Sequence, residues 1–149
     1  MLPLFLITNL GEEIGWRGYA LPRLLRRFNS LASSLIIGVC WAAFHWVALA
    51  QNPTRPWGYV AIGSVFLIAM SIAMTWVFNR TGSVVLMVLF HATYDVVAIG
   101  VIPLAGTGLP LLTFALTTAV LSLAAVLLIV AAGPELGRQS TSEVTPVRG

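Results

Sequence analysis

The sequence predicts an all-α, polytopic membrane protein, a bundle of about four to five transmembrane helices. Hydrophobic residues make up 58% of the chain and charged residues only 9%, whereas soluble domains carry about 25% charge. The mean hydropathy is +0.94. Apolar runs of about 20 residues, the length that crosses a hydrocarbon core, recur along the chain. These observations exclude an ordinary soluble domain.

The first apolar stretch, residues 1–11, has no basic segment before it and is not typical of a secretory signal. It is too short to span a bilayer alone. A helix that continues through Glu12 and Glu13 toward Tyr19 could span, and Leu21-Pro22 is expected to end it. Either the first helix is partly polar or the chain starts in the middle of a longer protein.

A short basic segment follows, in which Arg23, Arg26 and Arg27 alternate with leucines and Phe28. This pattern predicts a turn or helix that lies in the membrane interface.

Four further apolar runs predict the remaining helices. They cover residues 31 to about 50, 57–78, 83–102 and 111–132, with Pro, Gly and polar residues between them. The polar residues 133–149 predict a disordered tail. We therefore expect a membrane domain over 1–132 and a tail over 133–149.

The arginines predict the orientation of this layout. The side expected to be cytoplasmic, with the C-terminal tail, holds Arg23, Arg26, Arg27, Arg80, Arg138 and Arg148. Only Arg55 falls on the other side. Because the arginines are scattered between apolar runs, the net charge of +3 is typical of loop charges that set membrane orientation and does not indicate nucleic acid. The expected partner is membrane lipid. We expect an integral protein of a bacterial plasma membrane.

Ionisable residues interrupt the apolar runs in three places. They are Glu12, Glu13 and Arg17, then His45, then His91 and Asp95. A charge in hydrocarbon costs at least a few kcal/mol, so such residues usually face a protein-lined interior and mark a function. Each cluster lies about ten residues from a predicted membrane surface, so all three can meet near the midplane.

The spacing within the clusters supports a shared site. Glu13 and Arg17 are four residues apart and can pair on one helix face, while Glu12 is rotated by about 100° and can point elsewhere. His91 and Asp95, also four apart, present an imidazole and a carboxylate to one groove.

A carboxylate beside two imidazoles suits activation of water and stabilisation of an oxyanion. Trp41, one turn before His45, could wall the same site. The motif H-E-x-x-H is absent, so the spacing demands no metal. If a divalent metal such as zinc binds, its expected ligands are Glu12, His45 and His91.

These motifs resemble those of the CPBP family of intramembrane proteases, which includes type II CAAX prenyl endopeptidases and bacteriocin-processing or self-immunity proteins. Residues 11–22 resemble its first motif, EExxxR. Residues 41–45 are similar to its second, an aromatic residue followed four later by His. Residues 91–95 are similar to its third, with Asp95 where Asn is common.

The resemblance implies a role for each residue in the first two motifs. Glu12 would activate the hydrolytic water and His45 would assist. Glu13 and Arg17 would shape and hold the site. The reaction implied for residues 1–132 is hydrolysis of a peptide bond in a membrane-associated substrate, including prenylated CAAX-type proteins.

The third motif implies that His91 and Asp95 bind the substrate carbonyl and stabilise the oxyanion. A carboxylate donates a hydrogen bond to an oxyanion only when it is protonated. Trp41 replaces the more usual Phe of the second motif. Relatives carry several helices before the first motif, so we expect this chain to lack the N-terminal helices of the family core.

Three alternatives stay open at this level. The chain could be a noncatalytic self-immunity or scaffold protein of the same family. It could be a transporter or proton conduit, although no internal repeat is evident. It could ligate haem through His45 and His91, which would leave the glutamates unexplained.

Overall fold

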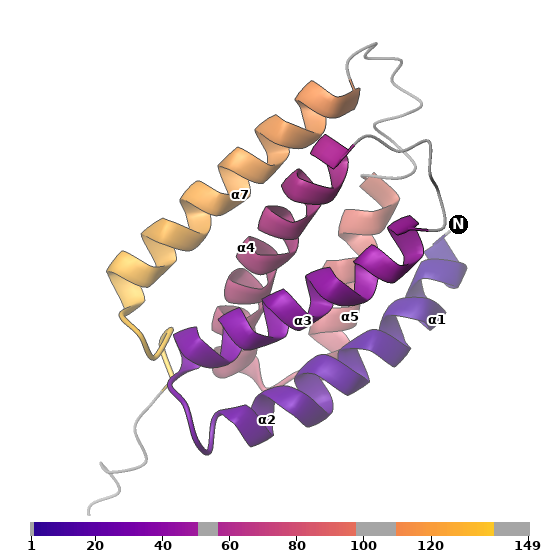
Figure 1. Cartoon of the computed structure of the whole chain (residues 1–149). Helices are drawn as coiled ribbons and strands as arrows, with labels where there is room; N and C mark the ends of the chain where they lie inside the picture. The colour runs from indigo at the N-terminus through magenta and orange to yellow at the C-terminus, as the bar shows by residue number, and fades with distance from the viewer. Residues whose placement is uncertain (1, 51–56, 98–109, 139–149) are drawn as a thin grey trace, which may run out of the picture.

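The apolar runs form helices in the computed structural model, which describes residues 2–50, 57–97 and 110–138 (Figure 1). In chain order the elements are α1 (Leu2–Glu13), the π-helix η1 (Ile14–Ala20), α2 (Leu21–Leu24), α3 (Ser30–Ala50), α4 (Trp57–Thr81), α5 (Val84–Asp95) and α7 (Pro110–Ala132). The described residues contain no strand. The predicted all-α class is confirmed.

The first helix continues further than the sequence predicted. α1, η1 and α2 follow one another without a gap, so the break expected at Leu21-Pro22 was wrong. Pro22 stands in the first turn of α2, where a missing backbone N–H costs little and the fixed φ suits a helix. The chain leaves the helix only after Leu24, and the basic segment forms its last turn and the connection to α3.

Neighbouring helices bring the three predicted motifs together. α3 packs against α4, α4 against α7, and α1 against α5. Figure 1 shows α7 at one side of the bundle and α1 at the other, with α3, α4 and α5 between them. The predicted motifs lie on α1 with η1, on α3 and on α5, and α1 and α5 pack directly against each other.

Small residues allow α3 and α4 to approach closely. A Cβ atom built on Gly38 would lie 2.9 Å from Cα of Ile68. One turn earlier on α3, the backbone oxygen of Ser34 accepts a hydrogen bond of 2.8 Å from Oγ of Ser71. Close contact through small residues with hydrogen bonds between helices is typical of packing in membranes.

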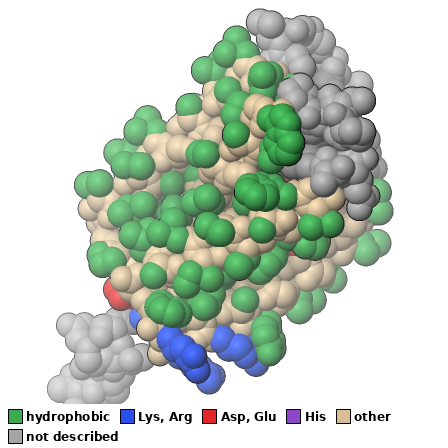
Figure 2. Space-filling view, in the orientation of Figure 1, with side chains coloured by type: hydrophobic (Ala, Val, Ile, Leu, Met, Phe, Trp, Pro, Cys, Tyr) green, Lys and Arg blue, Asp and Glu red, His purple; other side chains and the backbone are tan. Residues whose placement is uncertain are grey.

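Three helices are long and apolar enough to cross a membrane among the residues described. Their apolar windows are Ser30–Val47, Trp57–Thr81 and Leu111–Ala132. Large apolar side chains cover much of the visible surface (Figure 2), and Val120 and Val130 on α7 are 70% and 79% exposed. Such a surface suits lipid. α5 is shorter, and residues 98–102 of the run predicted to reach residue 102 lie outside the described residues.

The C-terminal segment departs from its prediction. Residues 133–138, expected to be disordered, form a turn after α7 in which Leu136 is fully buried. Gly133 has a φ of +65°, the left-handed conformation that commonly ends helices. Nδ2 of Asn79 donates to the backbone oxygens of Glu135 and Leu136. The assignment of disorder was therefore wrong for 133–138, and residues 139–149 lie outside the described part.

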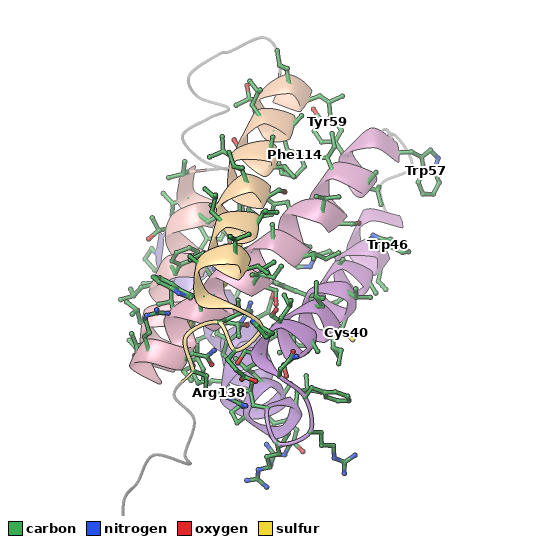
Figure 3. All side chains as sticks on the ribbon, turned by 90° about the vertical axis from the view of Figure 1, so that its left-hand side faces the viewer. Cys40, Trp46, Trp57, Tyr59, Phe114 and Arg138 are labelled. Atoms are coloured by element: carbon green, nitrogen blue, oxygen red, sulfur yellow. The ribbon has the colours of Figure 1, made fainter. Side chains whose placement is uncertain are left out.

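The exposed arginines gather at one end of the bundle. Arg23 in α2, and Arg26 and Arg27 just after it, are exposed, and Figure 2 shows basic side chains at the lower end of the molecule. Arg138 reaches the same end, where its Nη1 donates to the backbone oxygen of Leu25 at 2.8 Å (Figure 3). This grouping agrees with the one-sided arginines of the sequence, and the cytoplasmic orientation stays a prediction.

The α3–α4 contact yields a prediction about stability. We expect Gly38→Ala to lower the free energy of unfolding by about 1–3 kcal/mol, because its new methyl group meets backbone that must shift. The measurement is thermal unfolding of the purified protein in detergent. Gly58→Ala is the matched control, since a Cβ there meets nothing within 4 Å. Equal melting temperatures for the two variants would show that the helices have room to separate.

Candidate active site

One face of the first helix carries three buried polar side chains. Asn9, Glu13 and Arg17 follow one another at intervals of four residues, which keeps them on one side of the helix. Asn9 is 2% exposed, and Glu13 and Arg17 are fully buried. Because an unpaired buried charge is strongly destabilising, this face must meet complementary groups.

Glu13 meets two partners at a single oxygen. Its Oε1 accepts a hydrogen bond of 3.0 Å from Nη1 of Arg17, as the spacing predicted. The same oxygen lies 3.0 Å from Nδ1 of His91, a buried residue of α5. Since a carboxylate oxygen can only accept, Nδ1 of His91 carries the hydrogen in this bond. The first and third sequence clusters are therefore in direct contact.

Asp95 completes the contact between α1 and α5. Its Oδ2 lies 3.8 Å from Nε2 of His91 and accepts a hydrogen bond of 2.8 Å from Nδ2 of Asn9. The sequence reasoning missed Asn9. Its position one turn before Glu13, on the face that also carries Arg17, was the available signal. The two helices thus make two polar contacts, Asn9 with Asp95 and Glu13 with His91.

Trp41 of α3 connects the remaining groups and is fully buried. Its Nε1 donates to Oε2 of Glu12 at 2.8 Å. Its ring packs edge to face against His91, with 5.0 Å between ring centroids. The guanidinium of Arg17 lies 4.7 Å from the same ring, a cation–π distance. Trp41 therefore contacts side chains from all three sequence clusters, and its role as a wall of the site stays a prediction.

The adjacent glutamates point in different directions, as the sequence indicated. Glu13 faces α5 and is fully buried, whereas Glu12 faces Trp41 on α3 and is half-buried. Only one carboxylate oxygen of Glu12 has a hydrogen-bond partner among the described residues. Oε2 of Glu13 also has no partner among these residues, but it is buried. Because Glu12 is only half-buried, it is the carboxylate of the pair with an oxygen available to water or substrate.

His45 lies one turn after Trp41 on α3 and is half-buried. Its ring contacts the Trp41 ring at 6.0 Å between centroids, and its Nδ1 donates to the Trp41 backbone oxygen at 3.0 Å. Because a carbonyl oxygen only accepts, this bond leaves Nε2 of the neutral ring as an acceptor. Within the described residues, no hydrogen bond joins His45 to Glu12 or His91, so His45 shares the site through Trp41.

The predicted metal ligands do not form a ready cluster. Among the described residues, no group of three or more His, Cys, Asp or Glu side chains is arranged to hold a metal ion. Zinc held by Glu12, His45 and His91 would require these side chains to move, and it stays a prediction.

Both imidazoles pack against Trp41, which gives no support to ligation of haem between them.

Comparison with known proteins identifies related sequences. A family described as type II CAAX prenyl endopeptidase Rce1-like matches residues 1–97, the part that contains all six predicted site residues. A CAAX prenyl protease 2 of Methanococcus maripaludis is 28% identical over 99 residues. That match covers 61% of this chain and 36% of the relative, so the chain spans about a third of the relative's length. No solved structure matches the chain.

The two glutamates provide a matched test of this geometry. We expect Glu13→Gln to lower the free energy of unfolding by about 3–5 kcal/mol, because it leaves the buried Arg17 without its counter-charge. Glu12→Gln should change it by about 1 kcal/mol or less, since the amide oxygen can still accept from Trp41. Thermal unfolding in detergent measures both. Equal losses for the two variants would contradict the burial difference.

Proposed function

The chain belongs to the type II CAAX prenyl endopeptidase Rce1-like family, and on this premise we propose that it is an intramembrane endopeptidase in which Glu12 activates water. Its family, together with the three membrane-length apolar helices found among the described residues, makes it an integral membrane protein. The observation that carries the proposal is the meeting of Glu12, Glu13 and His91 around Trp41 inside an apolar bundle.

Water activation would use the two half-buried groups beside Trp41. The Trp41 N–H fixes one carboxylate oxygen of Glu12 and leaves the other to take a proton from water. Nε2 of His45 is an acceptor that can orient the same water or share its proton. The hydroxide oxygen then attacks the carbonyl carbon of the scissile peptide bond.

Stabilisation of the resulting oxyanion falls to His91. Its Nδ1–H is committed to Glu13, so only Nε2 can face the substrate. Nε2 donates to an oxyanion when the ring is doubly protonated, and the carboxylates of Glu13 and Asp95 lie beside the two ring nitrogens to compensate that charge.

Collapse of the tetrahedral intermediate would complete the reaction. The C–N bond breaks, the proton held by Glu12 passes to the leaving nitrogen, and a carboxylate and an amine are released. Glu13 and Arg17 take no part in proton transfer in this scheme. They fix His91 from the side away from the substrate.

In this proposal Asp95 does not contact the oxyanion, although the family resemblance implied that it would. Its Oδ2 accepts from Asn9, so this oxygen carries no hydrogen for an oxyanion. We therefore assign the oxyanion contact to His91 alone and a charge-compensating role to Asp95.

The proposed substrate is a membrane-associated peptide segment. The names of the family and of the Methanococcus maripaludis relative refer to CAAX prenyl proteins, and we extend that class, prenylated C-terminal segments, to this chain. The apolar surfaces of the helices suit a substrate that arrives through lipid. A noncatalytic immunity or scaffold role is the alternative that the following experiment separates.

We expect Glu12→Gln to lower the rate of cleavage by about 10²–10⁴-fold while the protein stays folded and inserted. The measurement compares new protein termini, by mass spectrometry, in membranes that express wild type or variant at matched levels. Glu135→Gln is the matched control, because Glu135 is half-buried like Glu12 but lies in the C-terminal turn, where it pairs with Arg138. Identical terminus profiles for wild type and Glu12→Gln would favour the noncatalytic alternative. Full activity in His91→Ala would remove His91 from the mechanism.

Treatment with a chelator tests whether cleavage requires a metal bound by Glu12, His45 and His91. We expect cleavage to survive treatment with a chelator, because no three donors converge among the described residues and Glu12 with His45 can act on water directly. The rate is measured on a peptide identified by the terminus comparison. Loss of the rate, with recovery on addition of Zn²⁺, would instead support ligation by Glu12, His45 and His91.

A further inference from the structure

Asn9 is a buried polar residue outside the three sequence motifs. It lies one turn before Glu13 on α1, and its side-chain amide faces Asp95 at the end of the described part of α5. Because a carboxylate oxygen only accepts, the amide nitrogen must face Asp95, at 2.8 Å. The bond joins residues 86 positions apart.

A second polar contact between α1 and α5 lies one turn away from this bond on each helix. Asn9 with Asp95 and Glu13 with His91 form two contacts between α1 and α5, each four residues from the other. His91 is thus bordered at Nδ1 by a carboxylate that binds it directly. It is bordered at Nε2 by a carboxylate that Asn9 holds.

The distances indicate what Asn9 does. Oδ2 of Asp95 is 3.8 Å from Nε2 of His91, too far for a hydrogen bond but close enough for a charge to act. The same oxygen is engaged by Asn9. Without that bond, Asp95 could close on Nε2 and occupy the atom assigned to face the substrate carbonyl.

We propose that Asn9 is a positioning residue that holds Asp95 away from His91 and so keeps Nε2 available to substrate. The inference rests on the proposed function for its effect on turnover, but the contact itself can be tested without a substrate. Asn9 touches no reacting atom in this scheme. Its influence passes through Asp95.

The experiment measures the NMR signals of the His91 ring nitrogens. The chain has only two histidines, so protein labelled with ¹⁵N-histidine gives few ring-nitrogen signals, and His45→Gln assigns them. We expect Asn9→Ala to move the His91 signals, chiefly Nε2, and to leave those of His45 in place. Turnover of an identified peptide should fall between about 10- and 100-fold, mainly in kcat.

A double-mutant cycle tests whether Asn9 acts through Asp95. In the Asp95→Ala background, Asn9→Ala should produce no further movement of the His91 signals and no further loss of turnover. Asn79→Ala is the matched control for stability. It also removes a part-buried amide with hydrogen bonds, but near the C-terminal end of α4, where its partners are Ser30 at the start of α3 and Glu135 in the C-terminal turn. Asn79→Ala should lower the melting temperature and leave both the His91 signals and the turnover unchanged.

Three results would overturn the inference. They are unchanged His91 signals in Asn9→Ala, the same signal changes in Asn79→Ala, and an Asn9→Ala effect that persists undiminished in the Asp95→Ala background. If wild type cleaves no peptide but the His91 signals still respond through Asp95, the contact stands and the proposed peptidase fails. The two failures are therefore distinguishable.

Discussion

A carboxylate buried in an apolar bundle must be met by opposite charge and hydrogen-bond donors, and Glu13 imposes this requirement on the whole fold. Arg17 meets it from the next turn of the same helix, and His91 meets it from α5. Without such partners the charge would disfavour the closed bundle. The need to satisfy Glu13 therefore fixes which face of α1 packs on α5 and which nitrogen of His91 carries its hydrogen.

Trp41 links this pair of helices to α3 because its side chain is apolar over most of its surface and polar at one atom. The indole fills the core with Phe66, Met70 and other side chains, while its N–H reaches Glu12. One residue thereby contributes to packing and fixes a carboxylate. Since Glu12 is half-buried where Glu13 is fully buried, two adjacent residues of the same type receive different chemistry from a rotation of about 100°.

Features set by local spacing or by composition could be predicted from the sequence. Apolar composition gave the helical membrane class, and four-residue spacing gave the Glu13–Arg17 pair. The common depth of the three clusters indicated that they could meet, but which side chains of distant segments pair with one another could not be predicted. The partner of Asn9 lies 86 residues away, and Leu136 becomes buried only once α7 has folded back toward α4. The break predicted at Pro22 was wrong because proline is tolerated in the first turn of a helix and disrupts a helix further in. The residues around Pro22 do not specify where that first turn begins.

The same contacts serve stability and the proposed chemistry, and this overlap decides how variants must be interpreted. Loss of activity in a Glu13 variant follows equally from a misplaced His91 and from an opened α1–α5 contact, because one oxygen supports both. Glu12 is different: its single described bond is to Trp41, and an amide can accept that bond as well. A charge-removing change at Glu12 therefore alters reactivity with little change in packing. For that reason, the assignment of a hydrolytic function depends on Glu12 and not on its more deeply buried neighbour.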